Sequence, residues 1–119
     1  MPTDPRTYIW EARRAAEQIG TFIAGRSWDD YQADAMLRSA VERQFEIVGE
    51  ALNKLSRTDA AVAEGITDLP RIVAFRNLLI HGYATIDDQL VWEVATERVG
   101  RLVITLGELL DDEPRPAGE

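Results

Sequence analysis

The side chains that could do chemistry lie together in one stretch, from Arg76 to Tyr83. The chain's one histidine, His81, stands in this stretch, five positions after the arginine and two before the tyrosine. Histidine is the side chain best suited to giving and taking protons near neutral pH, and arginine binds phosphate through a planar pair of donors. The pattern indicates phosphate chemistry, with His81 as general acid–base and Arg76 as the cation that stabilises a transition-state anion.

This stretch is predicted to form the end of a helix. Gly82 directly follows His81, and glycine is the residue most able to take the left-handed conformation that stops a helix. At about 100° per residue, Asn77 shares a helical face with His81, whereas Arg76 lies about 140° away. Arg76 can therefore meet the imidazole only from the side, or across to a second copy of the protein.

Each of these side chains also has a purely structural interpretation. His81 could simply be a C-terminal capping residue whose charge complements the helix dipole, and Arg76 could form a surface salt bridge worth little. Tyr83 is a candidate RNA contact or an anchor packed against the next helix. Asn77 either supports the site, by orienting His81 or contacting phosphate, or is a solvated polar position. Glu50 either accepts a bond from an arginine such as Arg76 or lies on a solvated helix face.

The periodicity of apolar residues predicts the helices that must position this stretch. Apolar residues recur at spacings of three and four in each long segment, and no segment alternates with period two. Helices are expected at roughly 5–24, 29–56, 68–81 and 87–111, with one or two helical turns within 57–67. Four substantial helices with short connections predict an all-α fold, an up-and-down four-helix bundle with an additional short helix.

Local signals mark ends and close contacts along these helices. Gly25 is expected to end the first helix, and Ser27 with Asp30 resembles a capping box. Gly49 lies inside the second long helix, where glycine costs about 1 kcal/mol relative to alanine, so close packing is expected there. The second and last helices carry more apolar surface than a four-helix core needs, which predicts a homodimer.

Composition limits the classes of function. At 119 residues the chain fits one domain, and the absence of cysteine excludes disulfides and thiolate metal sites. One histidine without a cluster of acidic ligands predicts neither a metal nor a cofactor. The net charge of −8, from 21 acidic and 13 basic residues, counts against generic nucleic-acid binding. RNA would have to bind at a local site, and a basic or site-masking partner is easier to reconcile with this charge.

The sequence predicts no association with a membrane. Charged or polar residues interrupt every apolar run before it reaches the length of a membrane span. The first six residues contain no apolar core that could serve as a signal peptide. A cytoplasmic location is the expectation.

Two stretches together resemble a known family. One is Arg76, four residues, His81, one residue and Tyr83, with the polar Asn77 after the arginine; the other is 41–55, with its Ile-x-Gly-Glu-Ala core. Both resemble the HepT-like branch of the HEPN ribonuclease superfamily. The resemblance covers roughly residues 7–110. We therefore expect a helical domain of this type over 1–111, and the two prolines and four charges of 112–119 predict a flexible acidic tail.

The resemblance implies the toxin of a type VII, or HEPN/MNT, toxin–antitoxin pair. Members are dimeric, metal-independent endoribonucleases that act on RNA such as tRNA or mRNA, and their Arg and His pairs meet in a cleft between two copies. Arg76 and His81 would be the catalytic residues here. The antitoxin is a minimal (MNT-type) nucleotidyltransferase that can attach AMP to the motif tyrosine, which would be Tyr83. The alternative is a non-catalytic helical interaction module that only binds such a partner.

Overall fold

The computed structural model describes residues 4–82 and 86–112, and every described secondary-structure element is a helix. The prediction of an all-α fold is therefore confirmed. Tyr83 and all of the predicted tail except Asp112 lie outside the described residues. The helices are α1 (Pro5–Ile23), α2 (Trp28–Ala33), α3 (Ala35–Thr58), α4 (Ala60–Ala63), α5 (Leu69–His81), α6 (Asp88–Glu97) and α7 (Val99–Asp112).

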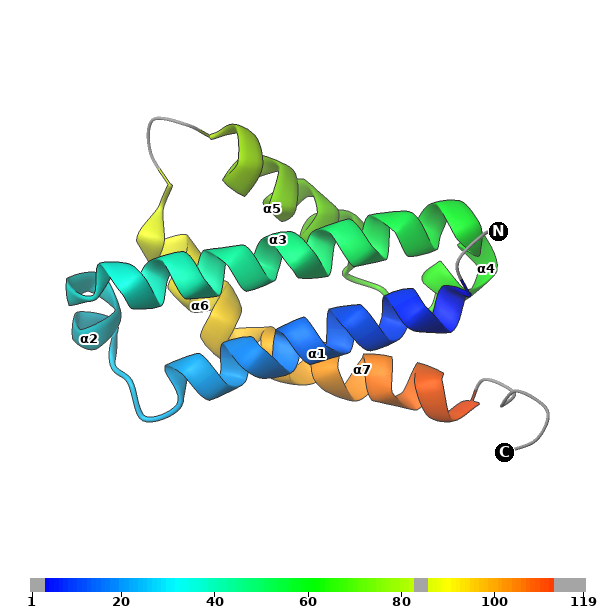
Figure 1. Cartoon of the computed structure of the whole chain (residues 1–119), viewed down its shortest axis with the longest axis horizontal. Helices are drawn as coiled ribbons and strands as arrows, with labels where there is room; N and C mark the ends of the chain where they lie inside the picture. The colour runs from blue at the N-terminus through cyan, green and yellow to red at the C-terminus, as the bar shows by residue number, and fades with distance from the viewer. Residues whose placement is uncertain (1–3, 83–85, 113–119) are drawn as a thin grey trace.

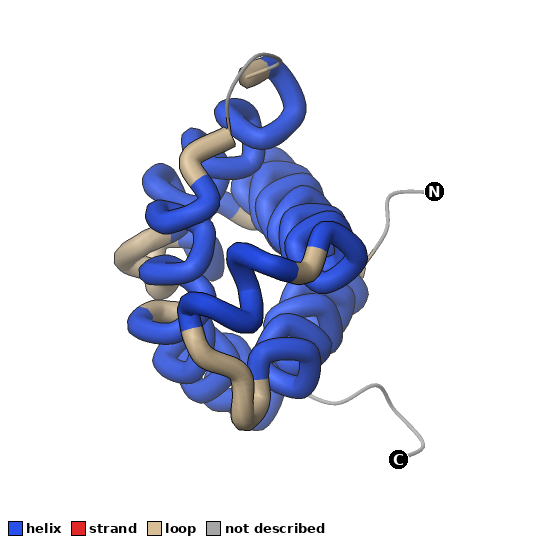
Figure 2. The backbone as a smooth tube through the Cα atoms, turned by 90° about the vertical axis from the view of Figure 1, so that its left-hand side faces the viewer, coloured by secondary structure: helices blue, strands red, loops and turns tan. Residues whose placement is uncertain are grey.

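The long helices alternate in direction along the chain. α1 and α3 run side by side and antiparallel, α7 packs along the other side of α1, and α5 packs against α3 (Figure 1). The short α2 lies across one end of the molecule, where it contacts α3 and α6 (Figure 2). The side chains that these helices bury completely are apolar or aromatic, among them Ile9, Ile19, Tyr31, Val41, Leu52, Leu55 and Leu106.

The helix predicted at 29–56 is two helices, because the chain breaks at Asp34. This residue has an extended conformation (φ −114°, ψ 99°), and its carboxylate accepts a hydrogen bond of 3.0 Å from the backbone N–H of Leu37. Aspartate is a strong N-cap, so the local bond to the start of a new helix outweighs continuing the old one. The break folds α2 back across the end of the molecule.

The helix predicted at 87–111 is also two helices, with a break at Arg98. Arg98 keeps its hydrogen bond to the Val94 carbonyl, but its φ of −116° departs from helical geometry. The kink lets α6 turn toward α2 and α3 while α7 follows α1 (Figure 1). The broad apolar surface of this segment therefore serves two different neighbours.

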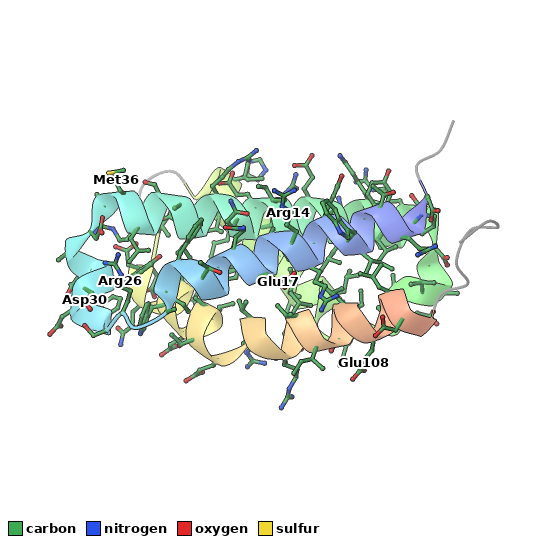
Figure 3. All side chains as sticks on the ribbon, turned by 60° about the horizontal axis from the view of Figure 1, so that its bottom comes forward. Arg14, Glu17, Arg26, Asp30, Met36 and Glu108 are labelled. Carbon is green, nitrogen blue, oxygen red and sulfur yellow. The ribbon has the colours of Figure 1, made fainter. Side chains whose placement is uncertain are left out.

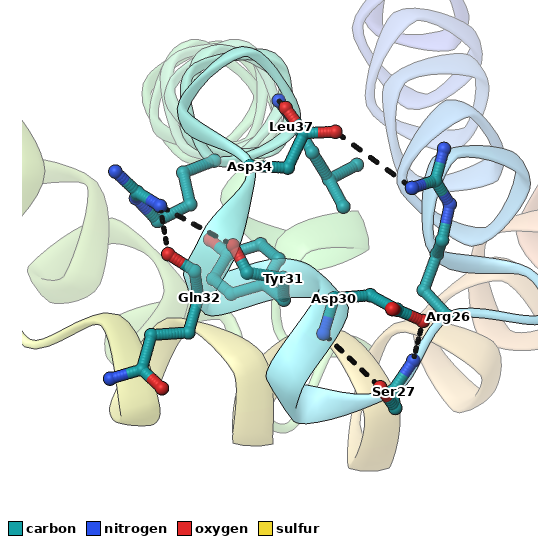
Figure 4. Close-up of polar contacts among 8 residues, drawn as sticks. Arg26, Ser27, Asp30, Tyr31, Gln32, Asp34 and Leu37 are labelled. Atoms are coloured by element: carbon teal, nitrogen blue, oxygen red, sulfur yellow. Dashed lines mark hydrogen bonds and ion pairs between the residues drawn. The ribbon is translucent and has the colours of Figure 1, made fainter.

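Of the predictions about where helices begin and end, those for the capping box and for Gly25 are confirmed. The left-handed conformation predicted for Gly82 is wrong. Ser27 and Asp30 form a complete capping box, each bonding to the other's backbone N–H (Figure 4). Gly25 follows α1 with a positive φ of 72°. Gly82 ends α5 as predicted but is not left-handed: its φ is −84° and its N–H donates to the Leu78 carbonyl at 2.7 Å. A Cβ at Gly82 would lie 2.6 Å from that carbonyl oxygen, so glycine is needed there for space.

Some large apolar side chains remain exposed on the described surface. Met36 is 84% exposed and projects from the first turn of α3 (Figure 3), while Ile104 is 63% and Leu78 53% exposed. The homodimer stays a prediction. Within 4–82 and 86–112, no helix combines the length and hydropathy that crossing a membrane requires.

Candidate functional site

The site residues are held by a close contact between α3 and α5. A Cβ built on Gly49 of α3 would lie 2.2 Å from the Cβ of Arg76 and 2.6 Å from its Cγ. Real Cβ atoms never come so close, so the stem of Arg76 occupies the space that a side chain at position 49 would fill. The close packing predicted at Gly49 is confirmed, and its partner is the candidate catalytic arginine.

A pair of aromatic rings supports this contact from the adjacent turn. Phe45 and Phe75 meet edge to face, with their centroids 5.1 Å apart. Such aromatic pairs have a preferred geometry and contribute about 0.5–1.5 kcal/mol beyond the area they bury. Phe75 immediately precedes Arg76, so the ring pair fixes the rotation of α5 at the point where the arginine leaves the helix.

The guanidinium of Arg76 is partly buried and has few partners. Its Nη1 donates a 2.8 Å hydrogen bond to Oδ1 of Asn77, and its Nε is buried without a partner among the described residues. No carboxylate in the described part of the chain forms an ion pair with Arg76. The surface salt bridge considered as its alternative role is thus not present there. The guanidinium keeps donors available for an anion.

Asn77 supports Arg76 in this structure rather than His81. Within the described residues, the one hydrogen bond of its amide is the one that its oxygen accepts from Arg76. The oxygen accepts this bond, and the amide NH₂ group keeps its two donors. Asn77 and Arg76 together therefore present N–H groups, which is the chemistry that binds a phosphate oxygen.

His81 is exposed, and it does not share a side of α5 with Arg76. It is the last residue of α5, whereas Arg76 faces α3 and is partly buried there. This matches the angle of about 140° expected between the two positions on a helix. One chain brings Arg76 and Asn77 together but leaves the imidazole on the outer surface.

The two remaining predicted site residues are Glu50 and Tyr83, and the structure describes only Glu50. Glu50 lies on the exposed face of α3, where its Oε1 is 3.4 Å from Nζ of Lys54. This pair is the solvated-face arrangement that was the alternative for Glu50. Tyr83 lies outside the described residues.

An apolar cavity of about 170 Å³ lies beside the site, and sequence patterns did not reveal it. It is bounded by residues of α3, α5, α6 and α7, including Phe45, Ile72, Phe75, Val94 and Leu102. Most of its lining is apolar, and three charged residues, Asp68, Arg71 and Arg98, also border it. In the described parts of the chain, no three His, Asp or Glu side chains are grouped to hold a metal ion.

A second polar cluster lies at the N-terminal end of α3. Nη1 of Arg38 donates to the carbonyl groups of Gln32 and Tyr31, and its Nε lies 3.6 Å from Oδ2 of Asp88. Burial is the main cause that raises the pKa of the nearby Glu42 carboxyl, and the charge of Asp88 adds to the effect. This cluster ties α2, α3 and α6 together at the end of the molecule opposite α4 (Figure 1).

Comparison with known proteins identifies the class. The family model described as "Ribonuclease HepT-like" matches residues 12–109. The chain therefore belongs to the HepT-like ribonuclease family, as the resemblance predicted.

Three curated relatives match along most of their own length. "Putative RNase TTE0752" of Caldanaerobacter subterraneus subsp. tengcongensis is 28% identical over 111 residues, which cover 92% of this chain and 96% of that protein. "Putative RNase MJ1380" of Methanocaldococcus jannaschii is 28% identical over 101 residues, with 83% and 90% covered. "Probable ribonuclease HepT" of Thermococcus cleftensis is 26% identical over 102 residues, with 86% and 92% covered. No solved structure gives a significant match.

Proposed function

We propose that this protein is a metal-independent endoribonuclease, the toxin of a HEPN/MNT (type VII) toxin–antitoxin pair. The observation that carries the proposal is the state of Arg76. Its stem is fixed on Gly49, and its guanidinium is bonded to Asn77 with no carboxylate paired to it in the described residues. A fixed cation with available donors suits a phosphorane better than a structural role. Family membership and the ribonuclease names of the relatives support RNA as the substrate. We take this RNA to be tRNA or mRNA.

In this proposal two copies complete one site. RNA cleavage needs a base for the 2′-OH proton and an acid for the 5′-oxygen, and each chain has one histidine. Arg76 and His81 lie on different sides of α5, so a shared groove is the arrangement that can bring one chain's imidazole to the other's guanidinium. Leu78, three residues before His81 and 53% exposed, is an apolar side chain that a second copy would cover.

The reaction would proceed by attack of the 2′-oxygen on phosphorus. One His81 removes the 2′-OH proton as the bond from the 2′-oxygen to phosphorus forms. The bond from phosphorus to the 5′-oxygen breaks, and the His81 of the second copy gives that oxygen a proton. Arg76 stabilises the charge of the phosphorane through its paired donors, and the NH₂ group of Asn77 adds a further contact. The products are a cyclic phosphate and a 5′-hydroxyl.

Neutralisation would come from a nucleotidyltransferase antitoxin in the same cytoplasm. Tyr83 follows α5 by two residues, so AMP attached to it would stand beside the proposed groove. A bulky anion there would obstruct the groove and repel RNA. The net charge of −8 already disfavours loose RNA binding, so blocking one local site would be enough to stop the enzyme.

The test removes the imidazole. His81→Ala is expected to abolish both growth inhibition and cleavage of cellular RNA while leaving the oligomeric state unchanged, as measured by light scattering. Wild-type cleavage is expected to continue in excess EDTA. RNA cleavage that persists in His81→Ala would rule out the acid–base assignment, and a requirement for added metal would overturn the metal-independent mechanism.

A further inference from the structure

The glycine in the middle of α3 stands out among the helical glycines of this chain. Gly20 in α1 and Gly100 in α7 have nothing within 4 Å of an added Cβ, so alanine would fit at either position. At Gly49 the added Cβ would overlap the stem of Arg76, the residue at the centre of the site. Since glycine destabilises a helix interior relative to alanine, its presence at this position has a reason in the packing.

We propose that Gly49 is a positioning residue for the reaction: the space left by its missing side chain sets where the Arg76 guanidinium lies. This inference rests on the proposed function. The overlap involves the Cβ and Cγ atoms of Arg76, which are nearest the backbone and have the least freedom to move aside. A methyl group at position 49 must therefore push α5 away from α3 or turn the arginine stem, and either change moves the guanidinium.

A small displacement is enough to matter chemically. A catalytic group misplaced by about 1 Å can lose about 100-fold in rate. The bond from Arg76 to Asn77 joins neighbours on the same helix, so it would move with α5 and would not restore the position relative to a second copy. The expected consequence is loss of transition-state stabilisation, with little change in RNA binding.

The first experiment compares Gly49→Ala with Gly20→Ala and Gly100→Ala in the full chain. The probe is a short fluorescently labelled RNA of mixed sequence. Gly49→Ala is expected to lower kcat by about 100-fold with little change in KM, the pattern of an interaction made only in the transition state. The two control variants are expected to keep the wild-type rate. A folded, dimeric Gly49→Ala protein with the wild-type kcat would overturn the proposal.

The second experiment separates positioning from general damage and does not need Gly49→Ala to fold. Arg76→Gly removes the overlapping stem, and its lost cleavage is expected to be partly restored by free guanidinium ion. Adding Gly49→Ala to this variant is expected to leave the restored rate unchanged, because no stem remains to be displaced. A much lower restored rate in the double variant would show that alanine at 49 acts through the fold in general, and would overturn the proposal.

The same variants show which idea fails. If Arg76→Gly cleaves RNA at the wild-type rate without guanidinium, the proposed function fails. If Arg76→Gly is inactive but a folded Gly49→Ala protein is fully active, the function stands and only the positioning role of Gly49 is lost.

Discussion

Two arginines, Arg38 of α3 and Arg76 of the neighbouring α5, use their hydrogen-bond donors in opposite ways. Arg38, near the start of α3, donates to two backbone carbonyl groups and lies 3.6 Å from the carboxylate of Asp88. Arg76, beside the middle of α3, has one hydrogen bond among the described residues, to Asn77. The first guanidinium joins three helices, while the second is fixed by its stem and keeps donors available.

The charges around the two arginines differ in the same sense. Arg38 lies among acidic groups, with Asp88 as its ion-pair partner and Glu42 close enough for their charges to influence each other. Arg76 has no such partner in the described residues. An arginine whose charge is neutralised within its own chain contributes to stability, whereas one without a counter-charge remains able to attract an anion. The contrast supports the proposal that Arg76, rather than Arg38, acts on the substrate.

The largest expected effect is on the rate of RNA cleavage, and it is tested by replacing each arginine in turn with methionine. Methionine keeps a long unbranched side chain but removes the hydrogen-bond donors. Arg76→Met is expected to lower the rate of RNA cleavage by about 100- to 1,000-fold, the range seen when one transition-state donor is lost. Arg38→Met is expected to keep the wild-type rate at temperatures where the protein is folded. Initial rates on a labelled RNA provide the measurement. Equal losses in two folded variants would remove the distinction between the arginines.

Arg38→Met should have the larger effect of the two variants when stability, rather than RNA cleavage, is measured. Arg38→Met leaves two backbone carbonyl groups and a carboxylate without their charged donor, and such bonds contribute about 1–3 kcal/mol. Arg38→Met is therefore expected to lower the free energy of unfolding by about that amount, and Arg76→Met by less. Urea unfolding followed by circular dichroism provides the measurement. A larger loss for Arg76→Met would mean that its guanidinium, too, serves mainly to hold the fold.

The smallest expected effect is a change in thermal stability on replacing Glu42, which lies near Arg38. Burial raises the pKa of its carboxyl, and the charge of Asp88 adds to this. A raised pKa means that the Glu42 carboxyl holds its proton more tightly in the folded protein than in the unfolded chain. Protonation of Glu42 therefore adds to the free energy of unfolding at low pH, and this contribution is lost as the pH rises through the folded-state pKa. Glu42→Gln is expected to raise the Tm at pH 7, with the gain shrinking toward pH 4. A constant or reversed difference across thermal melts at these pH values would contradict this account.

Features set by a few neighbouring residues could be predicted from the sequence. The capping box at Ser27 and Asp30, the end of α1 at Gly25 and the extent of α5 all follow from local chemistry. The break at Asp34 had a local signal, an aspartate able to cap, but the surrounding helical periodicity concealed it. The break at Arg98 depends on which helices α6 and α7 pack against, and local periodicity carries no information about that.

The sequence named candidate members of the site but could not give their geometry. The spacing of Arg76 and His81 indicated both the chemistry and their separation around the helix. Gly49 was predicted to pack closely, yet the sequence could not say that Arg76 was its partner, because periodicity within each helix does not determine which residues of two helices meet. The contact between Asn77 and Arg76 was also missed, since neighbours on a helix ordinarily point in different directions and only a long side chain can bend back.

The outward position of His81 has a consequence for how the protein would behave at low abundance. If a working site needs an imidazole from each of two molecules, then at concentrations below the dissociation constant for pairing the number of complete sites rises with the square of the amount of protein. A cell holding a few stray molecules would suffer almost no RNA damage. A modest rise in synthesis would produce a steep onset of toxicity, set by mass action alone.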